Sequence, residues 1–207
     1  MQDIAIFGGT FDPVHQGHLF IAQKAVEQFC LEQVIWVPSQ NPPHKQAALF
    51  EHRVAMLQLA TQENPKFTVS SIELQDSGTS YAINTFKNLS SCYPNTHWYW
   101  IIGLDAFQTL PNWYGGDELA QMCDWLIAPR HLGGENIAQS KVICKGIEQN
   151  FKENLHINWK LLSIPLVIIS SSMIRRLSCA GYSIHDLVTE PVRAYINTHR
   201  LYSNNSE

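Results

Sequence analysis

Two histidines three residues apart, His15 and His18, follow a glycine-rich stretch near the start of the chain. An apolar run at residues 4–6 precedes Gly8 and Gly9, and a helical pattern of apolar residues begins after the second histidine. Glycines lack a Cβ, so main-chain N–H groups in a turn from strand to helix can approach an anion closely. The N–H groups of the helix N-terminus also favour a phosphate there. The spacing therefore predicts a phosphate site in which both imidazoles donate to phosphoryl oxygens.

This pattern differs from two familiar phosphate loops. No Gly-Lys-Ser or Gly-Lys-Thr follows the glycines, so the stretch is not a P-loop, and it lacks the Gly-x-Gly-x-x-Gly fingerprint of dinucleotide sites. A single histidine is more often a structural hydrogen bonder than a catalyst, and glycine-rich turns are common. The interpretation as a phosphate site therefore depends on His15 and His18 occurring together in this order.

A second candidate anion site lies near the other end of the sequence. Ser170, Ser171 and Ser172 stand just ahead of an apolar helical start, and Arg175 follows one turn later. Serines at a helix N-terminus cap free N–H groups, and a guanidinium can hold two phosphate oxygens at once. A capped surface helix is the alternative interpretation of this segment taken alone.

A glycine and an acid follow the apolar run at residues 101–102. Gly103 ends this run, and Asp105 stands two residues later. In a parallel α/β sheet, a carboxylate in this place meets a ribose hydroxyl or a bound nucleotide, although it could equally cap a helix. We expect Asp105 to accept a hydrogen bond from a ligand hydroxyl.

Three further segments carry residues suited to a second ligand. His44 and Lys45 follow two prolines that stiffen the chain, and both side chains suit an anionic group. Thr85 lies near the start of a predicted helix, where main-chain N–H groups favour a carboxylate. Trp113 and Tyr114 offer a platform for a flat ring, although two adjacent aromatics are more often packing residues.

The composition restricts the classes of protein that fit these sites. A chain of 207 residues suits one well-buried domain, and we predict a single domain over residues 1–207. The net charge of −4 argues against nucleic acid as a partner, because phosphate contacts need clustered Lys and Arg. The five cysteines are scattered without a Cys-x-x-Cys pair, which fits reduced thiols. We expect a cytoplasmic protein without a membrane partner, because no signal-type or bilayer-length apolar run is seen.

Strand-like and helix-like patterns alternate along the chain. Helical spacing predicts helices at residues 49–61 and 82–89, besides those that follow His18 and Ser170. The predicted strands are residues 4–7, 34–37, 67–69, 98–102, 125–128 and, near the end, 160–164. This alternation predicts an α/β fold: a Rossmann-like doubly wound parallel sheet with a small helical C-terminal part. We also expect an irregular or helical insertion at residues 130–158 and a frayed tail at residues 203–207.

The motifs together resemble those of a known superfamily. The order Gly-Gly-Thr, Phe-Asp-Pro, His-x-Gly-His within residues 7–18 resembles the signature of the nucleotidyltransferases. The stretch Ile-Ser-Ser-Ser-Met-Ile-Arg at residues 169–175 matches a second element of that superfamily, except that Ser172 stands where threonine is usual. Pro-Pro-His-Lys, Ser-Tyr-Ala-Ile-Asn-Thr and Trp-Tyr, in this order, are similar to the bacterial nicotinate-nucleotide adenylyltransferases, and this similarity spans nearly the whole chain.

This resemblance implies transfer of an adenylyl group from ATP to nicotinate mononucleotide, which gives deamido-NAD and pyrophosphate. It implies that His18 meets the phosphoryl group under attack and that His15 and Arg175 meet neighbouring oxygens. The ATP-binding residues that it implies are Gly8, Gly9, Thr10, Phe11, His15, Gly17, His18, Gly103, Asp105, Ser171, Ser172 and Arg175. The mononucleotide-binding residues that it implies are His44, Lys45, Thr85, Trp113 and Tyr114. Mg²⁺ is expected with ATP, held by phosphate and water and not by protein side chains.

Other functions stay open at this stage. A phosphopantetheine adenylyltransferase shares the two-histidine chemistry but is disfavoured by the Pro-Pro-His-Lys and Trp-Tyr elements. A non-catalytic nucleotide-binding module would keep the fold without turnover. RNA binding lacks the basic surface that it requires. The oligomeric state is not fixed by the sequence, and a homo-oligomer is possible.

Overall fold

The computed structural model describes residues 1–42, 47–75, 78–129, 137–151, 155–165 and 167–203. Within these residues the strands form one parallel sheet in the order β3-β2-β1-β4-β5-β6. Their bounds are β1 Gln2–Gly9, β2 Gln33–Pro38, β3 Phe67–Val69, β4 Thr96–Gly103, β5 Asp124–Ala128 and β6 Trp159–Leu161. The order reverses between β1 and β4, which is where such sheets bind ligands. The predicted α/β fold is confirmed.

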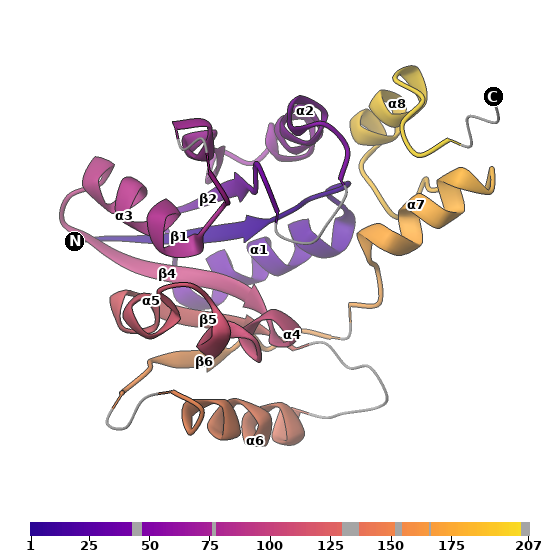
Figure 1. Ribbon diagram of the computed structural model, residues 1–207. Coiled ribbons are helices and arrows are strands. Elements are labelled where there is room, and N and C mark those ends of the chain that lie inside the picture. The colour runs from indigo at the N-terminus through magenta and orange to yellow at the C-terminus, as the bar shows by residue number, and fades with distance from the viewer. Residues whose placement is uncertain (43–46, 76–77, 130–136, 152–154, 166, 204–207) are drawn as a thin grey trace.

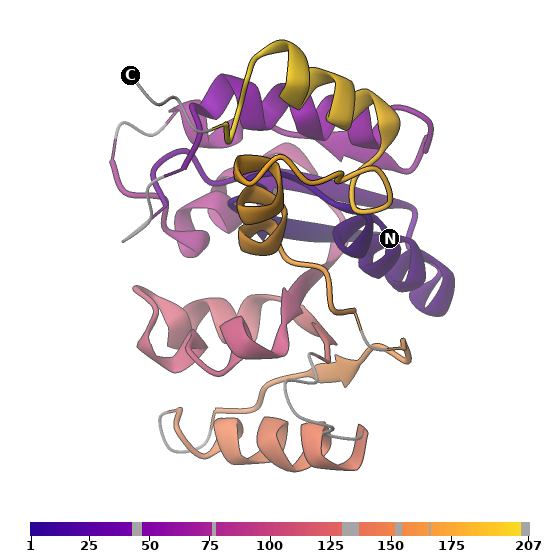
Figure 2. The same ribbon diagram turned by 90° about the vertical axis from the view of Figure 1, so that its right-hand side faces the viewer.

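Helices connect the strands and extend the chain beyond the sheet (Figure 1). The α-helices are α1 Gln16–Phe29, α2 Phe50–Thr61, α3 Ala82–Cys92, α4 Leu104–Phe107, α5 Gly116–Met122, α6 Ile137–Glu148, α7 Ser171–Cys179 and α8 Glu190–Thr198. Two 3₁₀-helices, η1 Ile72–Gln75 and η2 Leu110–Asn112, lie between them. The two views place α8 beside α2, far from α6 (Figure 1 and Figure 2). The helices α7 and α8 form the predicted helical C-terminal part.

Alternating side chains of the strands build two separate cores. In β4, Tyr99 and Ile101 join a cluster with residues of α1, α2, α7 and α8, whereas Trp98, Trp100 and Ile102 join one with residues of α3 to α6. Successive residues of a strand point to opposite faces, and burial on both faces makes such strands almost continuously apolar. Each face of the sheet is therefore covered by helices, as a doubly wound fold requires.

The last strand is shorter than predicted. A strand was expected at residues 160–164, but β6 ends at Leu161. The main chain of Ser163 instead pairs with the side chain of Gln28 in α1, through Ser163 N to Oε1 at 2.9 Å and Nε2 to Ser163 O at 2.9 Å. Pro165 follows and has no N–H to donate to a ladder. A side-chain amide thus takes the place of the neighbouring strand.

The glycines of the opening motif lie in β1 and not in the turn, so the predicted turn at Gly8 and Gly9 is wrong. A Cβ at Gly9 would stand 3.0 Å from the ring of Phe11, and one at Gly8 would stand 3.2 Å from Trp100. These glycines leave room for aromatic rings. The chain turns after them, where Phe11 has a φ of 49° and the bond from Asp12 to Pro13 is cis.

Parts of two sequence-based predictions fall outside the described residues. The segment predicted as an insertion, residues 130–158, contains α6 and, shortly before β6, the buried residue Ile157. Residues 130–136 and 152–154 of this segment are not described. Of the predicted tail, only Ser203 is described. No helix in the described part of the chain is long and apolar enough to cross a membrane.

Candidate active site

A cavity of about 180 Å³ opens at the carboxyl ends of β1 and β4, where the strand order reverses. It lies where the sheet topology predicts a ligand. The predicted site residues that line it are Gly8, Gly9, Phe11, His15, His18, Gly103 and Asp105. Apolar side chains of Ile102, Ala128, Val167 and Ile169 complete its walls. The cavity therefore combines polar groups along one side with a surface suited to a planar, uncharged ring.

The two histidines cap the first turn of α1 for each other. His15 is the N-cap residue; its Nδ1 accepts from the main-chain N–H of His18 at 3.3 Å, and Nδ1 of His18 accepts from that of His15 at 3.3 Å. The rings stack with centroids 3.6 Å apart and planes at 21°. Since each Nδ1 accepts a hydrogen bond, the proton of each neutral ring sits on Nε2. The local structure thus sets both imidazoles as Nε2 donors.

Helix α7 is hydrogen-bonded to the loop that carries the first histidine. Ser170 caps the helix, because its Oγ accepts from Met173 N at 3.3 Å. Ser171 Oγ donates to Pro13 O at 2.9 Å, and Arg175 Nη1 donates to Asp12 O at 2.7 Å. The two motifs predicted to bind phosphate, about 160 residues apart in sequence, therefore meet in space.

The remaining predicted residues of this group lie close by. Ser172 Oγ is 3.2 Å from Ser170 Oγ, at the start of α7. A Cβ on Gly17 would stand 2.6 Å from Val167 and 3.1 Å from Nδ1 of His15, so glycine is required there by close packing. The carbonyl of Thr10 accepts a hydrogen bond from a buried arginine, Arg53, at 2.9 Å.

Arg53 is a site residue that the sequence-based prediction missed. It is 1% exposed and donates to four carbonyl oxygens: Thr10 at 2.9 Å, Ser39 at 2.7 Å, Gln40 at 3.2 Å and Ala48 at 2.9 Å. Burial lowers the pKa of its guanidinium, and the nearby carboxylate of Asp12 opposes this shift. A single side chain thus joins the opening loop to the segment on either side of residues 43–46.

Asp12 was also missed as a site residue. It is buried and accepts from Tyr202 Oη at 2.6 Å and from Ala48 N at 3.3 Å, both at Oδ1. Its Oδ2 lies 3.7 Å from Arg175 Nη1. Asp12 therefore offers Arg175 two acceptors, its main-chain oxygen at 2.7 Å and its carboxylate at 3.7 Å.

Asp105 lies at the mouth of the cavity and is exposed. A Cβ at Gly103 would stand 2.6 Å from its Oδ1, so the carboxylate folds back over the end of β4. The oxygen is placed at the carboxyl end of a central strand, as a ligand hydroxyl would require.

The segments predicted for a second ligand converge on the start of α3. Gln40 N donates to Glu73 Oε2 at 2.7 Å, and Thr85 Oγ1 donates to Glu73 Oε1 at 2.9 Å. Asn41 N donates to Ser80 Oγ at 3.0 Å. The hydroxyl of Thr85 is therefore committed to a buried carboxylate, and no side chain caps the first turn of α3. His44 and Lys45 lie outside the described residues.

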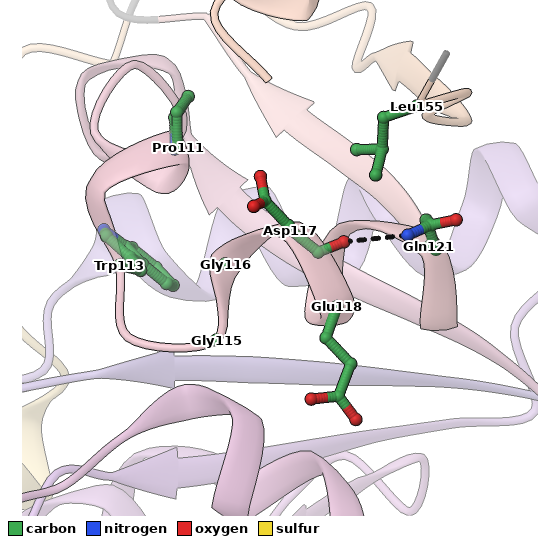
Figure 3. Close-up of a pocket in the computed structure, with 8 residues that line it drawn as sticks. All are labelled: Pro111, Trp113, Gly115, Gly116, Asp117, Glu118, Gln121 and Leu155. Atoms are coloured by element: carbon green, nitrogen blue, oxygen red, sulfur yellow. Dashed lines mark hydrogen bonds between the residues drawn. The ribbon is translucent and has the colours of Figure 1, made fainter. Parts of the chain in front are cut away.

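The two predicted aromatic residues face different surroundings. The Tyr114 ring is exposed and lies 4.5 Å from that of Tyr81, the N-cap residue of α3. Trp113 lines a second cavity of about 500 Å³ with Pro111, Asp117, Gln121 and Leu155 (Figure 3). Its indole Nε1 donates to Thr109 at 2.9 Å. The structure thus brings Tyr114 to the segment of Thr85, while Trp113 is not among the residues that line the histidine cavity.

The side-chain donors of the site suit an anionic ligand. Among the described residues no three His, Cys, Asp or Glu side chains are grouped so that they could hold a metal ion. The five cysteines are free thiols. The groups gathered around the cavity are imidazole and guanidinium donors, which suit phosphate oxygens.

Comparisons with known proteins identify the family. A family model described as cytidylyltransferase-like matches residues 6–177. A probable nicotinate-nucleotide adenylyltransferase of Trichormus variabilis is 65% identical over 208 residues, covering 100% of both chains. The chain belongs to the nicotinate-nucleotide adenylyltransferase family. Another relative of the same name, from Synechococcus sp., is 44% identical over 96% of both chains. The resemblance drawn from the motifs is confirmed.

Solved structures support the fold of this adenylyltransferase family. A Plasmodium falciparum nicotinic acid mononucleotide adenylyltransferase complexed with NaAD has a TM-score of 0.79 at 21% identity, covering 98% of both chains. The same enzyme complexed with APC has a TM-score of 0.77 at 20% identity and the same coverage. The parallel sheet and its helices are therefore shared over nearly the full length of the chain.

Proposed function

We propose that the chain transfers the adenylyl group of ATP to nicotinate mononucleotide, forming deamido-NAD and pyrophosphate. The observation that carries this proposal is the reciprocally capped pair His15 and His18, joined through the opening loop to Arg175 of α7. The name shared by relatives up to 65% identical supports the choice of substrates. In the reaction, a phosphate oxygen of the mononucleotide forms a bond to the α-phosphorus. The bond from that phosphorus to the bridging oxygen breaks, and the electron pair leaves with pyrophosphate.

The site is suited to a nucleophile that is already an anion. A mononucleotide phosphate needs no general base at neutral pH, so catalysis depends on alignment and on donors to the charged transition state. Nε2 of His18 donates to the phosphoryl group under attack, and Nε2 of His15 donates to a neighbouring oxygen. The capping pattern keeps both rings in the tautomer that donates from Nε2.

The far end of the triphosphate is assigned to α7 and the opening loop. Ser171, Ser172 and Arg175 are the donors proposed for the β- and γ-phosphates, with main-chain N–H groups of Gly9 and Thr10 alongside. Gly8, Phe11 and Gly17 shape the approach by close packing, and Asp105 accepts from a ribose hydroxyl. The apolar wall of the cavity suits the adenine ring.

Nicotinate mononucleotide is assigned to the segments gathered at α3. The main chain at Thr85 together with Tyr114 would meet the pyridine carboxylate, and Trp113 would stack on the ring. Because the Thr85 hydroxyl is bonded to Glu73, recognition of the carboxylate falls to main-chain N–H groups at the start of α3, of which that of Thr85 also donates to Tyr81 O at 3.2 Å. His44 and Lys45 are proposed for the mononucleotide phosphate, on the basis of the sequence alone.

Nucleotidyltransferases of this kind use a divalent metal with ATP, and we propose Mg²⁺. The site fits a cation held by triphosphate oxygens and water, because the described residues offer cationic donors and no carboxylate cage. When bound, the metal would neutralise charge on the phosphates. We place the reaction in the cytoplasm, where the five free thiols would stay reduced.

One assay tests the proposal against its alternatives. Pyrophosphate release is measured with ATP and Mg²⁺ plus, in turn, nicotinate mononucleotide, nicotinamide mononucleotide and phosphopantetheine. Release with nicotinate mononucleotide is expected. Release only with phosphopantetheine would assign the other adenylyltransferase activity, and release with none would favour a binding module.

A Lys45→Ala variant should mainly raise the KM for the mononucleotide; an effect confined to ATP would show that the Lys45 assignment is wrong.

A further inference from the structure

A tyrosine close to the end of the chain reaches the opening loop of the site. Tyr202 follows α8 and donates its hydroxyl to Asp12 Oδ1 at 2.6 Å, across 190 residues of sequence. Its ring packs against the core cluster that α1, α2 and α7 share. The turn that carries it is held by Leu201 N, which donates to Ile196 O at 3.0 Å, and Tyr202 has a φ of 60°. The phenol is thus fixed at both its ring and its hydroxyl.

Asp12, the partner of this phenol, connects several parts of the site. Asp12 is 3% exposed, and its carboxylate accepts from Ala48 N at 3.3 Å on the same oxygen as from Tyr202. Arg175 Nη1 donates to the main-chain oxygen of Asp12 at 2.7 Å, while Oδ2 of Asp12 lies 3.7 Å from that same nitrogen. Arg175 therefore stands between two acceptors of one residue, and it bonds to the neutral one.

The hydroxyl of Tyr202 makes the shorter of the two hydrogen bonds to Asp12 Oδ1, at 2.6 Å against 3.3 Å for Ala48 N. Burial raises the pKa of the Tyr202 hydroxyl, and its hydrogen bond to Asp12 acts in the same direction, so the group keeps its proton and donates. If this donor were removed, Oδ1 would retain only the longer bond from Ala48. A buried carboxylate short of donors attracts the nearest cation, which among its partners is the Arg175 guanidinium at 3.7 Å. Arg175 would then move from the Asp12 carbonyl towards the carboxylate.

We propose that Tyr202 is a positioning residue for adenylyl transfer, which holds the Asp12 carboxylate so that Arg175 stays on the Asp12 carbonyl and remains available to the triphosphate. This role rests on the proposed function of the site. It assigns a part in ATP binding to the turn after α8, which lies beside α7 in both views (Figure 1 and Figure 2). Tyr202 acts through Asp12 and does not itself touch the substrate.

The test compares two tyrosine variants that each lose one hydroxyl. Tyr202→Phe removes the donor to Asp12, and Tyr195→Phe is the matched control, because its hydroxyl lies 2.9 Å from Nδ1 of His52 and not near Asp12. We expect Tyr202→Phe to raise the KM for ATP about tenfold, as for loss of a hydrogen bond to a charged group, with the KM for nicotinate mononucleotide within about twofold of wild type. Tyr195→Phe should match wild type in both values.

A second variant measures the coupling through Asp12. In an Asp12→Asn background the pull of the carboxylate on Arg175 is absent, so adding Tyr202→Phe should change the KM for ATP less than twofold. Hydrogen exchange gives a readout besides activity: because Tyr202 no longer holds the carboxylate that accepts from Ala48 N, the Ala48 amide should exchange faster in Tyr202→Phe than in wild type, whereas Tyr195→Phe should match wild type. Additive effects of the two substitutions on the KM would overturn the positioning role, as would unchanged exchange at Ala48.

The outcomes separate the positioning role from the function on which it rests. If the wild-type protein released no pyrophosphate with any acceptor, both the proposed function and the positioning role of Tyr202 would be overturned. Active wild type with an unchanged Tyr202→Phe, or with equal rises in both KM values, would overturn the role of Tyr202 alone.

Discussion

The imidazole rings of His15 and His18 stack 3.6 Å apart, and each ring accepts the main-chain N–H of the other residue. The same two contacts therefore begin a helix and select a tautomer. A substitution at either position removes a proposed donor to the substrate together with a cap of α1.

His18→Ala tests the donor role. Loss of a transition-state donor is expected to lower kcat by about 100-fold or more, while loss of the cap lowers the free energy of unfolding by about 1 kcal/mol. Steady-state pyrophosphate release and urea unfolding measure the two effects separately. His185→Ala, at an exposed histidine outside the site, is the control and should change neither. Full activity of His18→Ala would contradict the donor role assigned to His18.

Gly17→Ala tests the packing of the helix start against the segment that lines the cavity. A new Cβ would stand 2.6 Å from Val167 Cγ1, so the helix start or Val167 must move, and we expect lower stability and a higher KM for ATP. Gly146→Ala is a matched control in α6, where a Cβ meets nothing within 4 Å. Helix propensity alone should make that variant more stable by about 0.5–1 kcal/mol.

A compensating change makes the Gly17 prediction sharper. Val167→Ala removes the methyl groups nearest to the new Cβ, so the double variant should recover part of the stability that Gly17→Ala loses. Thermal unfolding of the two single variants and the double variant gives the coupling. Strict additivity would mean that the clash with Val167 is not the cause.

Arg53→Met tests the buried guanidinium. Four carbonyl oxygens lose their donor, and we expect the free energy of unfolding to fall by about 3–5 kcal/mol, as for other broken buried networks. Arg193→Met, which removes an exposed pair with Glu190, should change the free energy of unfolding far less. Urea unfolding measures both. Equal losses in the two variants would contradict the role given to Arg53.

Stability should fall in alkaline solution because of buried thiols. Burial raises the pKa of Cys144 from its ordinary value of 9.0 to about 12, and it raises the pKa of Cys123 as well. Between pH 9 and 12 the unfolded chain releases a proton that folded Cys144 keeps, so the free energy of unfolding decreases as pH rises through this window. Urea midpoints at increasing pH test this, and Cys144→Ala should flatten the slope. Cys92→Ala, at an exposed thiol, should leave the slope unchanged.

The fold was largely predictable because each central strand carries its own signal. Trp98, Trp100 and Ile102 alternate with Tyr99 and Ile101, and such a run is buried on both faces wherever it occurs. The end of β6 was not predictable, because the chain leaves the sheet for a side chain of α1, Gln28, 135 residues earlier. The sequence around Ser163 gives no signal for a hydrogen bond to Gln28.

Some residues of the candidate site could be predicted from the sequence and others could not. His15, His18 and Gly17 are local in sequence, so their spacing shows their arrangement, whereas Asp12 and Tyr202 acquire their roles only through each other. Arg53 had a usable signal: it stands three and four residues before Met56 and Leu57, on the buried stripe of α2. A charged residue at an apolar position of a helix must find partners inside the protein, and here those are main-chain carbonyls.

The bonds from Ser171 and Arg175 to the main chain of Pro13 and Asp12 span 158 and 163 residues. During synthesis, His15 and His18 leave the ribosome long before α7 is made. A nascent chain that ends before α7 therefore carries the histidine motif without the helix proposed to hold the triphosphate. If ATP binds as proposed, its site is complete only when the sheet is assembled and α7 has docked, so protection by ATP against proteolysis would report completion of the fold.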